Sequence, residues 1–320
     1  MRPPREAEAR TVLSDGSAQY DVTRFLRLHP GGCNTLAAYK GASAATVAAK
    51  MRHEHSRAAN YLAGEYVPGA DPARDLEGLV DWSRPMLAQV GALGPRYYEW
   101  VCSPVDRPLR LFRSDLLEAL SVTPWRLVPA VWLPVVAAVL ARGLADNDLL
   151  SSPVRLQTLW FVPCLLLGLL LWSLLEYSIH RWVFHMRPPD DSPALITLHF
   201  LLHGLHHKVP FDSGRLLFPP ALAVAVALLL YSVLSLLFPA WMLHYVTAGT
   251  ISGYVTYDLM HYYLHYGSPG ADTYLYNMKR YHNQHHFTQH ESGFGISSSF
   301  WDDIFRTKII LKKLYITLKW

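Results

Sequence analysis

Long uncharged stretches alternate with polar segments along the second half of the chain, and this pattern predicts membrane helices. Residues 127–141 carry no charged side chain, and residues 156–175 carry none either. A helix needs about 20 apolar residues to cross a bilayer core. The second stretch has that length. The first is shorter and requires its flanking arginines to extend toward the polar surface, or else it forms a buried or re-entrant helix.

A third uncharged stretch runs over residues 216–257 and is too long for one helix. Phe238 and Pro239 divide it, because proline interrupts a helix, so we expect a hairpin of two helices and four spans in total. Lysines and arginines gather before the first span, between the second and third, and after the fourth, whereas the opposite loops contain only Arg142 and Arg155. The positive-inside rule therefore predicts that both termini are cytosolic.

The composition agrees with a membrane protein. Hydrophobic residues make up 51% of the chain and charged residues only 17%, against about 25% charged residues in soluble proteins. The net charge is +4 with no basic run, so no nucleic-acid partner is expected. Cys33, Cys102 and Cys164 are far apart, which predicts neither a disulfide framework nor a cysteine zinc site and favours a reducing compartment. No signal peptide is predicted before Asp15.

Sixteen histidines stand out, and ten of them form four groups next to the apolar stretches after residue 175. The groups are His180 and His185; His203, His206 and His207; His261 and His265; and His282, His285 and His286. Residues three or four apart share one helix face. Within each of the last three groups the imidazoles can therefore point in the same direction. His180 and His185 converge only if the helix ends or distorts near Pro188 and Pro189.

Ten neutral imidazoles supply about five ligands to each of two metal ions, and imidazole favours iron or zinc over magnesium or calcium. His199 and His290 each lie four residues from a group and are weaker candidates. His244 lies about 25 Å from His261 along the fourth predicted span, at 1.5 Å per residue, and is interpreted as structural. Glu176 and Asp258 lie close to histidines in sequence. They either orient imidazoles or are ordinary polar residues at helix ends.

The order of the histidine groups resembles that of the fatty acid hydroxylase and sterol desaturase superfamily over roughly residues 75–305. The matching strings run from Leu174 to Met186, from His206 to Asp212 and from Ser292 to Ser297. The resemblance implies a histidine-ligated dimetal centre that uses O₂ to cut an unactivated C–H bond. It implies iron for catalysis, with zinc able to occupy the same site.

A second resemblance lies near the N-terminus. The string His29-Pro30-Gly31-Gly32 and the later pair His55-Ser56 are similar to cytochrome b5. This resemblance implies that His29 and His55 are the axial ligands of a haem b, with His53 as the rival second ligand. Two axial histidines leave no open position for O₂, so such a haem carries electrons.

The two resemblances imply a fold class: a small α+β cytochrome b5-like domain followed by an all-α integral membrane domain with about four transmembrane helices and a cytosolic histidine-rich helical cap. The expected domains are residues 11–67 for haem binding, 68–80 as a linker and 81–307 for the membrane hydroxylase. Residues 308–320 form an unassigned basic and apolar tail. Two short strands are expected around the turn at Asp15-Gly16.

A cytochrome b5 domain fused to such a hydroxylase resembles the enzymes that hydroxylate C2 of long acyl chains destined for sphingolipids. This implies a multi-pass protein of the endoplasmic reticulum with a cytosolic active site, and electrons from an NAD(P)H-dependent reductase. A long acyl substrate needs an apolar slot. Candidates to hold its polar head, or to contact anionic lipid instead, are Lys208, Arg215, Lys279 and Arg280.

Two alternatives remain open from the sequence. A b5-fused acyl desaturase or sterol-modifying oxidase also carries histidine boxes, although the separate pair His261 and His265 fits the hydroxylase pattern better. A protein of another class, a membrane electron carrier with a structural zinc cluster, would cycle its haem without oxidising lipid. Product analysis distinguishes these alternatives.

Overall fold

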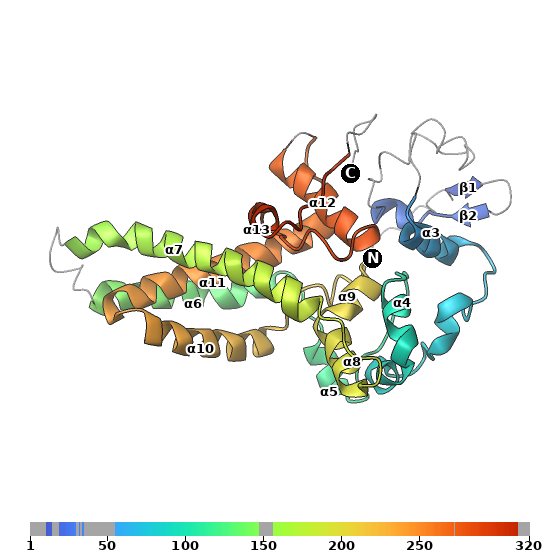
Figure 1. Cartoon of the computed structure of the whole chain (residues 1–320), viewed down its shortest axis with the longest axis horizontal. Coiled ribbons are helices and arrows are strands. Elements are labelled where there is room, and N and C mark those ends of the chain that lie inside the picture. The colour runs from blue at the N-terminus through green and yellow to red at the C-terminus, as the bar shows by residue number, and fades with distance from the viewer. Residues whose placement is uncertain are drawn as a thin grey trace, which may run out of the picture.

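The protein consists of a bundle of long apolar helices, a cap of shorter helices at one end of that bundle, and a small N-terminal unit beside the cap (Figure 1). The computed structural model describes residues 11–14, 19–29, 32, 34, 55–146, 156–271 and 273–312. The histidine-rich segments all lie where the cap meets the bundle.

The N-terminal unit combines a two-stranded sheet with short helices. Strands β1 (Val12–Ser14) and β2 (Gln19–Asp21) pair antiparallel, which confirms the two strands predicted there. The helices that follow are η1 (Phe25–Arg27), α3 (Arg57–Ala63) and η2 (Gly64–Tyr66). The Ser56 hydroxyl accepts a hydrogen bond from the Ala59 amide at 3.2 Å and so caps α3, which places His55 directly before this helix.

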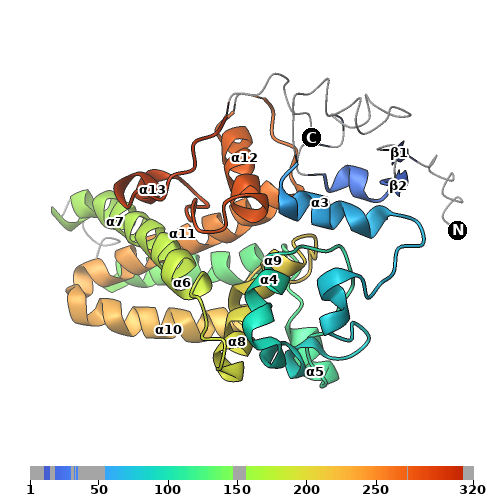
Figure 2. The same cartoon turned by 45° about the vertical axis from the view of Figure 1, so that its right-hand side comes forward.

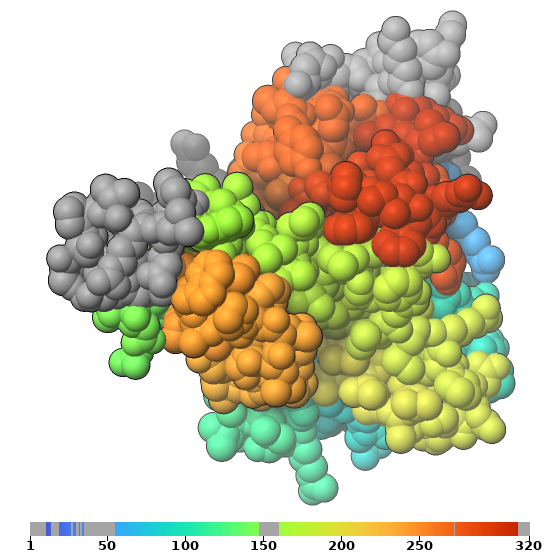
Figure 3. Space-filling view, turned by 60° about the vertical axis from the view of Figure 1, so that its left-hand side comes forward, coloured from blue at the N-terminus to red at the C-terminus, as the bar shows by residue number. Residues whose placement is uncertain are grey.

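Four long helices form the bundle at the positions expected from the uncharged stretches. They are α6 (Leu127–Asp146), α7 (Leu156–Ser178), α10 (Pro220–Leu237) and α11 (Ala240–Tyr266). Phe238 and Pro239 separate the last two, as predicted. Figure 3 shows the face of the bundle where α7 and α10 lie at the surface.

Three helical segments of the described chain are long and apolar enough to cross a membrane: Leu127–Asp146, Trp160–Phe184 and Pro220–Leu237. The first is therefore a full-length apolar helix rather than a short one. Helix α11 is more polar than the other three, and it packs against both α6 and α7, burying much of its own surface. It stays a predicted fourth span.

Helices α7 and α11 cross at two glycines. A Cβ atom added to Gly168 would collide with the carbonyl oxygen of Val246, and one added to Gly249 would collide with the carbonyl oxygen of Leu165. Small residues let membrane helices approach closely, so these two glycines set the spacing between the helix that carries His180 and the helix that carries His261.

The cap is built from short helices that precede the bundle helices in the sequence, lie between α7 and α10, or follow α11 (Figure 2). Before the bundle lie η3 (Asp75–Leu79), η4 (Met86–Ala88), η5 (Val90–Arg96), α4 (Tyr97–Val101) and α5 (Asp115–Leu120). Later in the chain lie α8 (Pro193–His199), η7 (Phe200–Gly204), α9 (Leu205–Lys208), α12 (Tyr274–Phe287) and α13 (Phe300–Ile304). Trp100 and Phe200 are fully buried in its core. The expected linker contributes Leu76 and Val80 to this core.

Candidate metal centre

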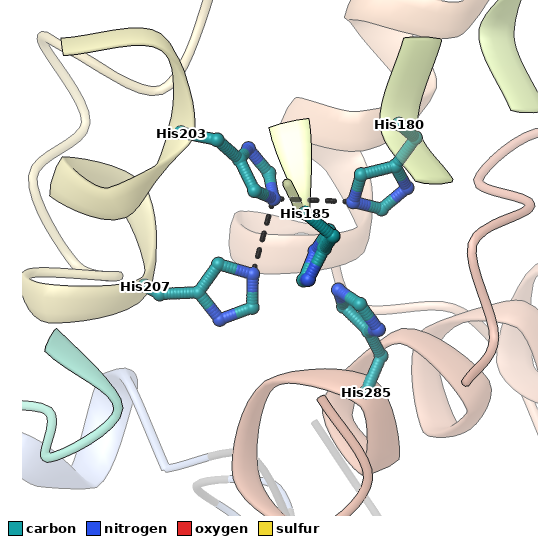
Figure 4. A group of neighbouring side chains, drawn as sticks. All are labelled: His180, His185, His203, His207 and His285. Atoms are coloured by element: carbon teal, nitrogen blue, oxygen red, sulfur yellow. Dashed lines mark hydrogen bonds between the residues drawn. The ribbon is translucent and has the colours of Figure 1, made fainter. Parts of the chain in front are cut away.

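Ten histidine side chains converge into two groups of five at the junction of bundle and cap. The first group is His180, His185, His203, His207 and His285 (Figure 4). The second group is His206, His261, His265, His282 and His286. Within each group the potential ligand nitrogens all lie within 4.8 Å of one another. The structure thus brings together every histidine predicted as a metal ligand.

A π-helical turn makes His180 and His185 converge. Segment η6 (Ile179–Phe184) continues α7 with the wider hydrogen-bond pattern, and the His185 amide donates to the His180 carbonyl at 3.0 Å. A π turn is wider than an α turn, so residues five apart share a face. The expected distortion is confirmed, but it begins several residues before Pro188 and is not caused by that proline.

The two triads on the cap helices each divide between the groups. On η7 and α9, His203 and His207 point to the first group and His206 to the second. On α12, His285 joins the first group while His282 and His286 join the second. Positions three and four apart lie on slightly different lines of a helix face, which lets one triad serve two neighbouring sites.

The distances between nitrogens fit metal ligation. His203 Nε2 lies 3.1 Å from His180 Nε2 and 3.0 Å from His207 Nε2. His261 Nε2 lies 3.1 Å from the Nε2 atoms of both His206 and His282. Nitrogens bound at about 2.1 Å to one metal at right angles lie about 3.0 Å apart. Imidazole nitrogens therefore sit at the spacing of neighbouring ligands in both groups.

Several of these nitrogens have no other partner in the described chain. The Nε2 atoms of His185, His285 and His286 are buried and make no hydrogen bond with the described residues. Burying an unpaired polar atom is costly, and a metal ion at the centre of each group would remove that cost. The donor set therefore fits two metal ions of a kind that prefers nitrogen ligands.

Two backbone carbonyls set the tautomers in the first group. His180 Nδ1 lies 2.5 Å from the Phe294 carbonyl, and His285 Nδ1 lies 2.7 Å from the Ser292 carbonyl. A carbonyl only accepts, so each Nδ1 carries the hydrogen and each Nε2 keeps its lone pair for a metal. Burial also holds the pKa values of His203 and His207 well below the ordinary value, so these imidazoles are neutral.

Glu176 acts on the site indirectly. Among the described residues it forms no hydrogen bond with a histidine. Its carboxylate accepts from the Ile296 and Ser297 amides at 2.9 and 2.7 Å. This holds the loop whose Phe294 carbonyl binds His180. The idea that Glu176 orients an imidazole directly is therefore wrong in its geometry. Asp302, which sequence reasoning missed, supports the same loop by accepting from the Phe294 amide at 2.9 Å.

The remaining histidines lie outside the two groups, as their weaker spacing suggested. His199 Nδ1 pairs with the Tyr97 hydroxyl at 2.6 Å. His290 packs against His207 with 5.6 Å between ring centroids. His244 lies at the far end of α11, 3.7 Å from an Asp146 oxygen.

An apolar cavity of about 540 Å³ opens beside the two histidine groups. It runs between the bundle helices, and His203, His206 and His261 line it where it meets the centre. Tyr254 and Asp258 also face it. The Asp258 Oδ2 atom is buried and has no hydrogen-bond partner among the described residues, so this carboxylate belongs to the cavity wall rather than to an imidazole.

Of the four basic residues expected near a polar head, only Arg215 lines the cavity, and it is paired with Glu118 and Asp212. Lys208 is fully buried and donates to Glu77 at 2.6 Å. Lys279 donates to backbone carbonyls, and so does Arg280. The expectation is therefore wrong for Lys208 and Lys279, because their charged groups are buried and occupied within the protein. It stays a prediction for Arg280, whose bond to the Lys312 carbonyl is exposed.

The two histidines of the N-terminal unit face each other. The ring centroids of His29 and His55 lie 6.5 Å apart, with 72° between the ring planes. The turn after His29 closes through the Gly32 amide, 2.8 Å from the His29 carbonyl, with Gly32 at φ +95°, a conformation that glycine adopts readily. His53, the rival ligand, lies outside the described residues.

Comparisons with known proteins agree with the geometry. A family model described as fatty acid hydroxylase matches residues 165–307. The chain is 42% identical to "Fatty acid 2-hydroxylase" of Rattus norvegicus, covering 92% of this chain and 90% of the relative. It is 41% identical to "Dihydroceramide fatty acyl 2-hydroxylase FAH2" of Arabidopsis thaliana, covering 71% and 92%.

A solved structure has the same architecture. It is titled "Full length scs7p (only hydroxylase domain visible)" and aligns with a TM-score of 0.65 at 31% sequence identity. The alignment covers 74% of this chain and 88% of that one.

Proposed function

This chain belongs to the fatty acid 2-hydroxylase family, and we propose that it hydroxylates C2 of long acyl chains destined for sphingolipids at a dimetal centre. One observation carries the proposal: two groups of five histidines converge at metal-ligand spacing and open onto an apolar cavity. Named relatives act on fatty acids and on dihydroceramide acyl chains. This supports an acyl substrate for this chain too.

Each part of the site has a task in such a reaction. Two iron ions held by the ten histidines would supply O₂ activation, and zinc would fit the same ligands without redox chemistry. The carbonyls of Phe294 and Ser292 keep His180 and His285 oriented. The cavity walls would exclude water from the acyl chain, and a chain bound there could reach His203, His206 and His261 with its C2 carbon.

Electrons would arrive through a haem b in the N-terminal unit. A metal–nitrogen bond of about 2 Å on each side plus the radius of each ring puts the centroids of two axial imidazoles about 6.4 Å apart. The 6.5 Å between His29 and His55 fits that arrangement. A tether between donor and acceptor raises the effective concentration of the donor. An NAD(P)H-dependent reductase would reduce the haem again.

The test of the metal centre uses variants from three elements. In His282→Ala, His261→Ala and His206→Ala we expect metal content to fall and formation of 2-hydroxy lipid to drop to background, because O₂ activation needs both metals at fixed geometry. His244→Ala is the control, because His244 lies about 25 Å from His261 along α11, at 1.5 Å per residue. Elemental analysis and lipid mass spectrometry give the readouts. Full activity in His282→Ala and His261→Ala would favour the electron carrier instead.

The haem ligands need a separate test on the full chain. The wild type should show the absorbance of a low-spin b-type haem, and His29→Ala and His55→Ala should each lose it. His53→Ala is the matched comparison and should keep the spectrum. Loss of the spectrum in His53→Ala but not in His55→Ala would identify His53, rather than His55, as the second haem ligand.

The proposed placement is the membrane of the endoplasmic reticulum with both termini and the metal centre in the cytosol. The basic residues that flank the uncharged stretches support it. Tags at either end should be open to protease from the cytosolic side of sealed microsomes. A protected C-terminal tag beside an accessible N-terminal tag would mean an odd number of spans.

A further inference from the structure

The N-terminal unit packs against the cap directly next to a metal ligand. Val22, Phe25 and Leu62 of this unit form a buried apolar cluster with Phe287 of α12, and Phe211 packs against the same cluster. Phe287 follows His286 in the chain. In Figures 1 and 2 helix α3 correspondingly lies at one end of α12.

Aromatic rings continue across this contact from one proposed cofactor site to the other. The ring centroid of Phe25 lies 5.6 Å from that of His29 and 5.8 Å from that of Phe211. Phe211 lies 6.4 Å from Phe287, which lies 6.2 Å from His286. The rings thus form an unbroken series of contacts between the two metal-binding regions.

Polar contacts fix the N-terminal unit at the rim of the same interface. Arg107 binds Glu65 through two nitrogens, at 2.6 and 2.8 Å, and both side chains are largely buried. The Tyr66 hydroxyl donates to Asp106 at 2.9 Å. Bidentate arginine–carboxylate pairs fix orientation as well as distance. The interface therefore defines one docked position.

A second polar contact at the rim connects α3 to α9, one of the helices that carry the histidines. The Tyr61 hydroxyl of α3 donates to Glu77 at 2.7 Å, and the same Glu77 oxygen accepts from Lys208 at 2.6 Å. Lys208 follows His207 and has no exposed surface. Apolar and ionic contacts thus attach the N-terminal unit to the elements that carry the histidines.

We propose that this interface is a built electron-transfer dock, in which Phe25, Phe211 and Phe287 hold the His29 side of the haem toward His286. The inference rests on the proposed function. With a haem held by His29 and His55 and metal ions held by the ten histidines, each crossing would oxidise one ferrous haem to the ferric state and deliver one electron to the metal centre. Two electrons, two protons and one O₂ would convert a C–H bond into C–OH and release one water. The NAD(P)H-dependent reductase returns the haem to the ferrous state.

The docked geometry matters because electron tunnelling falls steeply with distance. A free tether would leave the haem domain near the metals only part of the time, and the transfer rate would fall with the docked fraction. The apolar cluster and the Glu65–Arg107 pair hold the domain in place. The dock therefore removes the search step from every turnover.

The experiment uses the full enzyme in nanodiscs with haem, metals and a long-chain ceramide. The haem is reduced without oxygen and mixed with O₂, and its reoxidation is followed by absorbance. Phe211→Asp puts a charge into the apolar contact, and we expect reoxidation at least about tenfold slower, equivalent to about 1.4 kcal/mol. Arg107→Glu should slow it as well. Phe211→Leu, which keeps the contact apolar but removes a ring, should slow reoxidation less than Phe211→Asp does.

Two controls separate this inference from the proposed function. His282→Ala gives the rate of haem autoxidation without an intact metal centre, and Phe300→Asp places the same charge on α13, where Phe300 is 54% exposed. Metal content and the haem spectrum are measured for every variant. Wild-type enzyme without a haem spectrum would contradict the proposed function. A wild-type reoxidation rate in Phe211→Asp and Arg107→Glu, with haem and metal intact, would overturn the dock alone.

Discussion

The amide of His185 donates to the carbonyl of His180 across five residues at 3.0 Å, and this one bond places both imidazoles in the same metal-binding group. On a regular α-helix, residues five apart point about 140° away from each other. The π-helical turn at the C-terminal end of α7 removes this divergence and brings the two imidazoles onto one face. A helix defect and a ligand pair are therefore the same feature.

The first prediction concerns Glu176, which supports the loop that orients His180. Glu176 is buried and accepts hydrogen bonds from the loop that holds His180. Glu176→Ala frees the loop, so the Phe294 carbonyl no longer fixes the imidazole. Loss of such an indirect partner lowers metal affinity by about 10–100-fold. Metal titration of the purified enzyme measures the change.

Glu176→Gln is the matched variant, because its amide oxygen still accepts from the Ile296 and Ser297 amides. It should retain much more metal than Glu176→Ala. Equal metal affinity in Glu176→Ala and wild type would show that the loop holds His180 without this carboxylate.

The sequence predicted which histidines converge far better than it predicted the residues that support them. Spacing identified eight of the ten histidines because residues three and four apart share a helix face, whereas His180 and His185, five apart, required a distorted helix. It could not identify the π turn, since prolines placed the expected distortion too late. It also could not pair Glu176 with Ser297, which are 121 residues apart and meet only when α7 packs under the loop.

The basic residues illustrate a second limit. Lys208 carries a charge in a polar segment, which made it a candidate to hold the polar head of the substrate or to contact anionic lipid. Its ammonium group lies 4.5 Å from the centre of the Trp100 ring and bonds to Glu77. Burial lowers the pKa of Lys208 to about 8 although Glu77 acts in the opposite direction. Such a pairing depends on tertiary contacts that no local pattern encodes.

A second prediction concerns the crossing of α7 and α11. Gly249→Ala places a methyl group against the Leu165 carbonyl and forces the two helices apart. Overpacking of this kind costs about 1–3 kcal/mol, despite the better helix propensity of alanine. We expect a lower unfolding temperature in detergent and a loss of metal, because His180 and His261 lie on these two helices.

Gly270→Ala is the control for the same chemical change. The nearest atom to a Cβ at Gly270 is the Thr273 Cγ2 atom, at 3.7 Å, which is an ordinary contact. This variant should unfold at the wild-type temperature. If Gly249→Ala and Gly270→Ala both unfolded at the wild-type temperature, the close approach of the helices at Gly249 would not limit stability.

The third prediction concerns acid stability through His199. Burial lowers the pKa of His199 to about 4. Between pH 6.5 and 4 the unfolded chain therefore binds this proton more readily than the folded protein does. Stability falls as the pH falls through this window, by roughly 3 kcal/mol at its lower end for this residue alone.

His199→Gln removes the titration and keeps a hydrogen-bonding group for Tyr97. Thermal unfolding at pH 7 and pH 5 compares it with the wild type. We expect the variant to lose less stability than the wild type on acidification. Because all other titrating groups are common to both proteins, identical losses would mean that His199 is not protonated more easily on unfolding.

The last prediction tests the cavity as the acyl-chain site. Ala227 lines it on α10, about 10 Å along the helix from Pro220 at 1.5 Å per residue, and so away from the metal ligands. Ala227→Trp should fill that part of the cavity and exclude the end of a long chain. Excluding two methylene groups costs about 1.6 kcal/mol at about 0.8 kcal/mol each, which lowers the ratio of long to shorter products about tenfold.

Leu236→Trp provides the matched control, since Leu236 lies on the same helix with 86% of its surface exposed and does not line the cavity. Mass spectrometry of 2-hydroxy lipids from cells expressing each variant gives the chain-length profile. Ala227→Trp should keep its activity on shorter chains, because the ten histidines are untouched. An unchanged profile in Ala227→Trp would place the acyl chain outside this cavity, whereas a shift of equal size in Leu236→Trp would trace the effect to the surrounding lipid.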